Sequence, residues 1–140
     1  MNRVEALKQL AFEKKDFDGF LITNEANLLY LAGFLGATGI LVPKNGENLL
    51  YVYSVNYEQA KVEGKGFRVE LVKRGENLMK KIGVDKEEVI VIGDTKYDIC
   101  MFEKAGTCIA FNAKGELIKH ADIVIMEQDL NRLIKIFKNY

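Results

Sequence analysis

The chain contains no tryptophan, one proline, one histidine and two cysteines among its 140 residues. A single histidine beside only two cysteines does not supply the repeated ligand pairs of a zinc site. Cys100 and Cys108 fall on an expected helix and on the strand that follows it. We interpret both cysteines as small apolar side chains that are buried in a protein of a reducing compartment. We therefore expect no disulfide and no cysteine-based metal site.

An excess of positive charge is also absent, because 20 Lys and Arg residues balance 20 Asp and Glu residues. Partners such as nucleic acids or anionic membranes usually require a basic excess, and neither is expected here. The longest apolar stretches, such as residues 28–35, are far shorter than the roughly 20 residues that cross a bilayer. The amino-terminal MNRVEALKQLAFEKK lacks the apolar core of a signal peptide. A cytoplasmic protein is the expectation.

Helical and extended patterns alternate along the chain. In the first part, apolar runs predict strands at 19–23, 39–42, 48–54 and 67–72, with helices at 25–31 and 57–62. Asn45-Gly46 is the strongest hairpin signal. The second part predicts strands at 89–92, 107–111 and 123–126, and helices at 76–82, 98–104, 116–120 and 129–137.

This alternation predicts an α/β fold, namely a three-layer sandwich around a largely parallel, mixed sheet with one hairpin. No linker or low-complexity tract divides the chain near residue 72. Each half, about 70 residues long, is too short to close a core alone. We therefore expect a single domain over residues 1–140.

One segment, VIVIGDTKYDICMFEKAG at residues 89–106, offers a site. Its buried strand delivers Asp94 to the carboxyl end, where parallel sheets open a ligand crevice. Gly93 allows the backbone to leave the strand tightly. Asp98 follows at the start of a helix, so two carboxylates can converge. Paired carboxylates suit Mg²⁺, which prefers oxygen ligands and keeps several waters.

The stretch IVIGDTKYDICMFEKAGTCIAFNAKGELIKHADIVIMEQDL resembles the carboxyl-terminal part of haloacid dehalogenase phosphatases, most closely their phosphoserine phosphatase branch. The resemblance covers residues 73–140 and includes the GDxxxD motif. It implies that Asp94 binds Mg²⁺ directly and that Asp98 supports the metal or orients the cation. The family's upstream lysine opens a K-G-E-x-x-L pattern. The corresponding sequence here is KRGENL, so either Lys73 or Arg74 supplies the positive charge for a small phosphorylated ligand.

Two further residues are candidates for phosphate binding. Lys114 lies just after a strand's carboxyl end together with Asn112, on the edge that also carries Asp94. Thr95 has a hydroxyl that can donate to a phosphate oxygen, although a turn residue is an equally good interpretation.

The nucleophile of that family, an aspartate in an hhhhDxDGT motif at the end of the first strand, has no clear counterpart. The closest text is DFDGFL, in which Phe20 replaces the threonine. In this chain the predicted strand comes after Asp16 and Asp18. In the family, the nucleophile comes at the end of its strand. These two aspartates remain the only nucleophile candidates, and a solvated loop is the alternative.

The first half has another resemblance. The text FDGFLITNEANLLYLAGFLGATGILVPKNGENLLYVYSVNYEQAK is similar to the amino-terminal domain of creatinase, prolidase and Xaa-Pro aminopeptidases, over residues 1–72. This resemblance implies an α/β unit that packs against a metallopeptidase domain, mediates dimerisation and contributes to the substrate mouth. The family often reads Asp-Gly-Arg-Tyr where this chain reads Ser54-Val55-Asn56-Tyr57. We expect no peptidase activity from this chain alone, and a homodimer.

Three functions follow from these observations. The first is a degenerate phosphohydrolase relative that keeps a Mg²⁺ and phosphate site and acts as a binding or regulatory module. The second is an active Mg²⁺-dependent phosphatase, with its nucleophile supplied by Asp16 or Asp18 or by another subunit. The third is a peptide-related module like the aminopeptidase amino-terminal domain.

Overall fold

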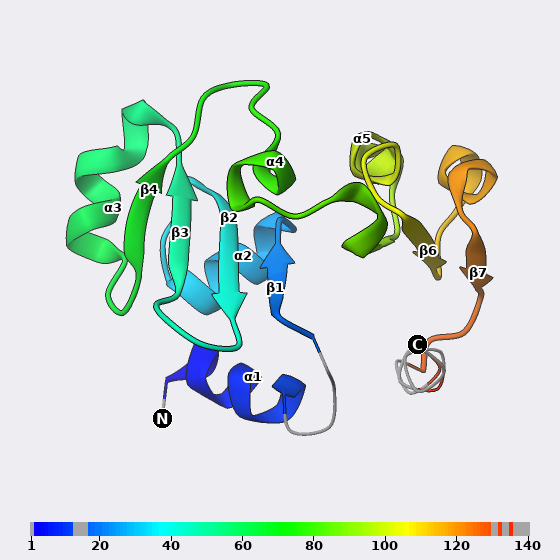
Figure 1. Ribbon diagram of the computed structural model, residues 1–140, viewed down its shortest axis with the longest axis horizontal. Coiled ribbons are helices and arrows are strands. Elements are labelled where there is room, and N and C mark those ends of the chain that lie inside the picture. The colour runs from blue at the N-terminus through cyan, green and yellow to red at the C-terminus, as the bar shows by residue number, and fades with distance from the viewer. Residues whose placement is uncertain (1, 13–16, 130–131, 133–134, 136–140) are drawn as a thin grey trace. The chain divides into compact units, whose positions relative to one another are not determined.

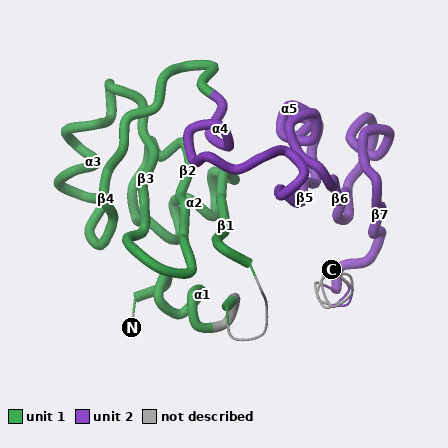
Figure 2. Tube along the Cα trace, viewed as in Figure 1, with its two compact units in different colours: residues 1–76 green, residues 77–140 purple. Residues whose placement is uncertain are grey.

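The computed structural model describes residues 2–12, 17–129, 132 and 135. Within it the chain forms two compact units, residues 1–76 and 77–140 (Figure 2). The boundary lies close to the point where the two sequence resemblances meet. The two units are described separately below.

The first unit contains a four-stranded mixed sheet in the order β1-β2-β3-β4 (Figure 1). The strands are β1 (Gly19–Ile22), β2 (Ala37–Pro43), β3 (Leu49–Val52) and β4 (Arg68–Leu71). β1, β2 and β3 pair antiparallel, and β4 runs parallel to β3. The predicted hairpin is confirmed between β2 and β3, where Gly46 takes a φ of 100° that suits glycine.

Three helices accompany this sheet, namely α1 (Arg3–Phe12), α2 (Glu25–Ala32) and α3 (Tyr57–Glu63). α2 begins because the Asn24 side chain accepts a hydrogen bond from the Asn27 amide. It ends at Gly33, whose left-handed φ of 66° lets its N–H bond the Leu29 carbonyl. α2 packs against β2, and α3 packs along β4 (Figure 1).

Branched aliphatic side chains form the core of the first unit. Ile40, Val42, Leu50 and Val52 are fully buried there. Their alternation along β2 and β3 points them to the same face, as the period of two for strands requires. The helices α1 and α2 contribute Val4 and Leu28 to the same cluster.

The second unit contains a three-stranded parallel sheet. Its strands are β5 (Ile90–Gly93), β6 (Thr107–Phe111) and β7 (Ile123–Ile125), in that order. Gly93 pairs with Ala110, and Ala110 with Val124, so the three carboxyl ends lie at one edge. Parallel pairing is the arrangement that the alternating sequence pattern predicts.

The connections in this unit are short. They comprise α4 (Leu78–Ile82), α5 (Ile99–Phe102) and three 3₁₀ turns, η2 (Lys86–Glu88), η3 (Lys96–Asp98) and η4 (Gly115–His120). Small side chains, including Ala105, Ala110 and Ala113, surround the larger Phe102 and Leu117 in the main core cluster. This small-residue core allows the short turns to approach the sheet closely.

Several expected boundaries change. The predicted helix at 76–82 begins only at Leu78, because the Asn77 side chain caps it by accepting from the Met79 and Lys80 amides. The predicted helix at 116–120 is a 3₁₀ turn, and most of the helix predicted at 129–137 lies outside the described residues. The expectation that both cysteines are buried is wrong for Cys100, which is exposed, and right for Cys108.

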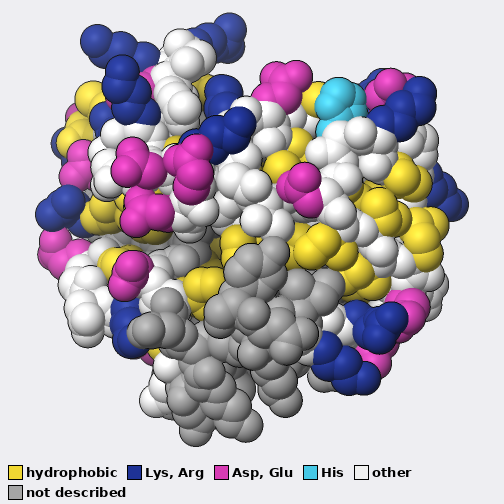
Figure 3. Space-filling model, turned by 45° about the vertical axis from the view of Figure 1, so that its right-hand side comes forward, with side chains coloured by type: hydrophobic (Ala, Val, Ile, Leu, Met, Phe, Trp, Pro, Cys, Tyr) yellow, Lys and Arg dark blue, Asp and Glu magenta, His cyan; other side chains and the backbone are white. Residues whose placement is uncertain are grey.

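The α/β class, with a mixed sheet that includes parallel strands and one hairpin, is confirmed. The single-domain interpretation stays a prediction. Among the described helices, none has the length and apolar character needed to cross a bilayer. Basic and acidic side chains are interspersed on the face shown in Figure 3.

Candidate functional site

The candidate site is built on the turn that follows β5. Asp94 comes directly after Gly93, at the carboxyl end of this parallel strand. A Cβ at Gly93 would lie 2.7 Å from the Cβ of Asp98. Since such a contact is too short for two carbon atoms, the close return of the turn requires glycine. The strand end, the glycine and both aspartates therefore form one tight loop.

The Asp98 carboxylate closes this loop. Its Oδ2 accepts hydrogen bonds from the Asp94 amide at 3.0 Å, the Thr95 amide at 3.0 Å and the Thr95 hydroxyl at 3.3 Å. Backbone donors bonded to an ionised acceptor are among the stronger protein hydrogen bonds. Asp98 thus orients the turn, while the side chain of Asp94 is exposed to solvent.

The neighbouring strand β6 brings Asn112 and Lys114 to the same sheet edge. The backbone N–H of Asn112 donates to the Ile125 carbonyl at 2.6 Å. Asn112 takes a left-handed φ of 48°, which asparagine tolerates. Ala113 is fully buried, which anchors the loop, and Lys114 is exposed. The η3 turn that contains Asp98 packs against η4, which begins directly after Lys114.

Lys73 and Arg74 belong to the first unit and follow β4. Both are exposed. The Lys73 amide donates to Glu76 Oε2 at 2.9 Å, and Gly75 in this turn has a φ of 75°. The turn presents two adjacent cations, and the choice between them stays open.

Of the two nucleophile candidates, the structure describes only Asp18. Asp18 is exposed and precedes β1, and its carbonyl accepts from the Lys44 amide at 2.8 Å. Thr23 and Asn24 follow the carboxyl end of β1, and Asn24 serves as the α2 cap. No aspartate therefore follows β1. Asp16 lies outside the described residues.

Asp94 offers a single exposed carboxylate to a hydrated divalent cation. Within the part of the chain that the structure describes, no three His, Cys, Asp or Glu side chains form a metal-binding group. Mg²⁺ is commonly held by one or two carboxylates together with waters and phosphate oxygens. Asp94 can provide one carboxylate, and Asp98 holds the loop in place.

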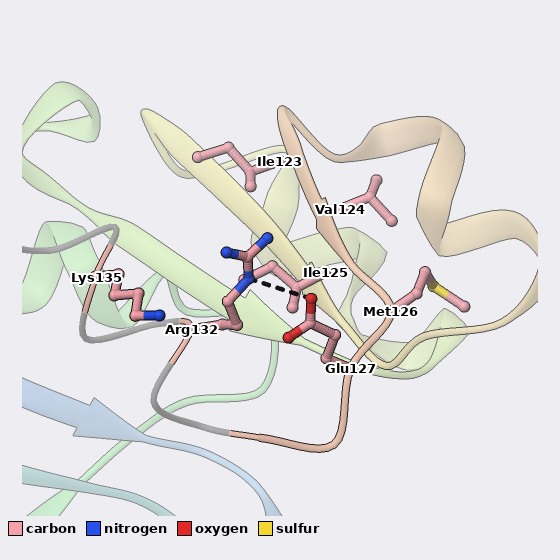
Figure 4. Close-up of a pocket in the computed structure, with 7 residues that line it drawn as sticks. All are labelled: Ile123, Val124, Ile125, Met126, Glu127, Arg132 and Lys135. Atoms are coloured by element: carbon pink, nitrogen blue, oxygen red, sulfur yellow. Dashed lines mark ion pairs between the residues drawn. The ribbon is translucent and has the colours of Figure 1, made fainter.

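A second feature of this unit was not anticipated. Ile123, Ile125, Glu127, Arg132 and Lys135 are among the residues lining a cavity of about 350 Å³ beside β7 (Figure 4). Arg132 Nε pairs with Glu127 Oε1 at 3.2 Å, drawn as a dashed line in Figure 4. In the sequence, the only signal for this cavity is the spacing of Arg132 and Lys135, which are three residues apart in the predicted helix at 129–137.

The fold and the loop define the class, an α/β protein with a candidate ion-binding turn at the end of a parallel strand. The chain belongs to the Creatinase/Prolidase N-terminal domain family, whose profile matches residues 3–96. An uncharacterized peptidase of Bacillus subtilis is 37% identical over 79 residues, which are 56% of this chain and 21% of that protein. A proline dipeptidase of Streptococcus pneumoniae has the same fold, with a TM-score of 0.51, 18% identity and 97% of this chain and 99% of that chain covered.

Residues 72–135 match a second profile, that of haloacid dehalogenase-like hydrolase. The phosphoserine phosphatase of Methanocaldococcus jannaschii is 43% identical over 63 residues, which are 45% of this chain and 30% of that protein. Both sequence resemblances are thereby confirmed. The chain spans less than a third of either curated relative, at 30% and 21%. The two profiles overlap over residues 72–96, which include Asp94.

Proposed function

We propose that this chain is a Mg²⁺- and phosphate-binding module that does not hydrolyse phosphate esters and that acts by binding or regulation. The observation that carries the proposal is the direction of two strands. Asp94 follows β5 and stands at its carboxyl end, whereas Asp18 precedes β1. A metal-binding carboxylate is therefore supported, but an aspartate that could form a covalent phosphoryl intermediate is not.

In this proposal Asp94 holds Mg²⁺ and Asp98 keeps its loop closed. Bound Mg²⁺ supplies positive charge for phosphate oxygens. Lys114 adds a cation at the same sheet edge. Lys73 or Arg74, in the first unit, stays a candidate phosphate-binding cation on the sequence resemblance alone. Thr95 contributes a hydroxyl when it is released from Asp98. The ligand is a small phosphorylated compound, and we propose a cytoplasmic homodimer as the working form.

Two measurements on the full chain test this function. Turnover of p-nitrophenyl phosphate with Mg²⁺ should be absent, and calorimetry should detect inorganic phosphate binding that requires Mg²⁺. Asp94→Asn should abolish that binding, whereas Asp18→Asn, the matched control at the other strand, should preserve it. Turnover lost in both Asp94→Asn and the double variant Asp16→Asn, Asp18→Asn would instead establish an active phosphatase. Absence of phosphate binding in the unaltered chain would refute the module.

The family match over residues 3–96 favours one further candidate, a peptide-related module. Short Xaa-Pro peptides would then bind to the chain without being cleaved. Titration with such a peptide, in the absence of Mg²⁺ and phosphate, separates this function from the proposed one.

A further inference from the structure

The first unit has a cavity that is independent of the candidate phosphate site. It measures about 360 Å³, within the range of small-molecule pockets. Leu28, Leu29, Phe34 and Leu35 provide apolar walls, and Glu25, Thr38 and Asn56 provide polar atoms. These residues come from α2, from the loop that follows it, from the start of β2 and from the η1 turn (Ser54–Asn56).

A hydrogen bond joins two segments of the rim of this cavity. The Asn56 side chain donates from Nδ2 to the Gly36 carbonyl at 3.2 Å and so ties η1 to the loop after α2. Gly36 has a φ of 112°, and a Cβ there would lie 2.7 Å from Asn56 Nδ2. Thr38 stands at the bulge in the pairing between β2 and β3. Bulges re-aim side chains and are frequent beside binding sites.

Apolar side chains around this rim face solvent. Leu35 is 66% exposed and Leu29 is 42% exposed, and both line the cavity. Single exposed aliphatic residues are ordinary, but a group of them around a cavity is typical of a ligand site. A ligand with an aliphatic body can cover Leu29 and Leu35 and gain the free energy of burying them.

The charge at this cavity has one sign. Glu25 is the only charged residue between Thr23 and Pro43 in the sequence. Among the described residues that line the cavity, it is also the only charged one. Arg3, which contacts α2 through Tyr30, donates to the Tyr30 carbonyl and stacks on its ring, and neither residue lines the cavity. We propose that this cavity binds small aliphatic amines, with the ammonium group beside Glu25 and the aliphatic body against Leu29 and Leu35.

Three ligands with nearly the same branched body and different charge test the proposal: isoamylamine, isoamyl alcohol and isovalerate. Each is titrated into the ¹⁵N-labelled full chain at neutral pH, without Mg²⁺ or phosphate. We expect the amine to bind with a dissociation constant in the millimolar range, as suits so few atoms. An exposed ion pair should make it about 3- to 5-fold tighter than the alcohol, with the carboxylate weakest. Amide shifts should centre on Thr38 and Asn56.

Matched variants assign the two parts of the interaction. Glu25→Gln should make the amine and the alcohol bind equally, and Leu35→Ser should weaken all three ligands. Glu58→Gln and Val62→Ser, on α3 and not among the residues that line the cavity, should leave the binding of all three ligands unchanged. Added salt should reduce the preference for the amine. Equal binding of the amine and the alcohol to the unaltered chain, shifts centred elsewhere, or no binding would overturn the proposal.

Discussion

β1 and β5 offer a direct comparison between the two units. Each is a four-residue strand with an exposed aspartate at one end, Asp18 before β1 and Asp94 after β5. β1 pairs antiparallel with β2, whereas β5 lies in a wholly parallel sheet. Only in a parallel sheet do the loops after successive strands meet at one edge. The end of the strand at which an aspartate stands, rather than the presence of an acid, therefore decides whether it lies where the loops of a parallel sheet converge.

The cores differ as well. Ile40, Val42, Leu50 and Val52 fill the first unit with branched side chains. The main cluster of the second contains three alanines and a cysteine beside Phe102 and Leu117. Fewer large buried side chains therefore support the unit that carries the Asp94 turn.

The largest expected effect comes from truncating one leucine in each core. Leu50→Ala and Leu117→Ala should each lower the free energy of unfolding by about 3 kcal/mol, because both side chains are fully buried. Urea denaturation followed by circular dichroism measures the loss.

Val55→Ala is the control for both, since Val55 is exposed and should change stability by less than about 0.5 kcal/mol. A single transition that shifts in both variants would support the predicted single domain. Two transitions, each shifted by only one variant, would contradict it.

The sequence predicted the strands well, because apolar runs such as residues 107–111 and the Asn45-Gly46 turn are local signals. It also predicted that Asp94 and Lys114 share a sheet edge, which follows from parallel pairing. The predicted helix at 76–82 begins two residues before α4 does. Its second residue, Asn77, is the cap that precedes the helix, and the apolar pattern does not distinguish a cap from a helical residue.

Other features could not be read from the sequence. The resemblance implies that Asp98 supports the metal or orients the cation, which stays a prediction. Its three hydrogen bonds to the loop depend on the return path of the turn. The cavity beside Glu25 needs Gly36 and Asn56, 20 residues apart, to meet. Such contacts are set by tertiary packing rather than by local pattern.

The second prediction sharpens the contrast between the aspartates. Asp98→Ala should lower the free energy of unfolding by about 1.5 kcal/mol, because it leaves two backbone amides without their acceptor. Asp94→Ala and Asp18→Ala should each cost less than about 0.5 kcal/mol, since both are exposed. Chemical denaturation of the three variants measures these differences. Equal losses in all three would mean that Asp98 has no special role in the turn.

The third prediction compares one helix cap from each unit. Asn24 accepts from the Asn27 amide at 3.2 Å, and Asn77 accepts from the Met79 amide at 3.0 Å. Replacing either by alanine should cost about 1 kcal/mol, and aspartate should restore the loss because it caps equally well. Thermal unfolding checks both pairs. An aspartate variant no more stable than its alanine counterpart would show that capping is not the cause.

The smallest expected effect concerns one titratable group in each unit at alkaline pH. Burial raises the pKa of the Cys108 thiol, with the Asp122 charge adding to the effect, from an ordinary value of 9.0. Burial likewise raises the pKa of the Tyr51 phenol, with Glu70 adding, from 10.0. Both groups are neutral when protonated. Above the ordinary value, the unfolded chain therefore binds fewer protons than the folded chain, and stability falls as pH rises.

Each group can contribute a slope of at most about 1.4 kcal/mol per pH unit. The loss from Cys108 begins near pH 9.0 and that from Tyr51 near pH 10.0. Cys108→Ala should therefore flatten the dependence of the unfolding free energy on pH from about pH 9.0 upward. Tyr51→Phe should flatten it only from about pH 10.0 upward. Cys100→Ala, at the exposed cysteine, is the matched control. If Cys108→Ala and Cys100→Ala give the same curve, burial of the Cys108 thiol does not control alkaline stability.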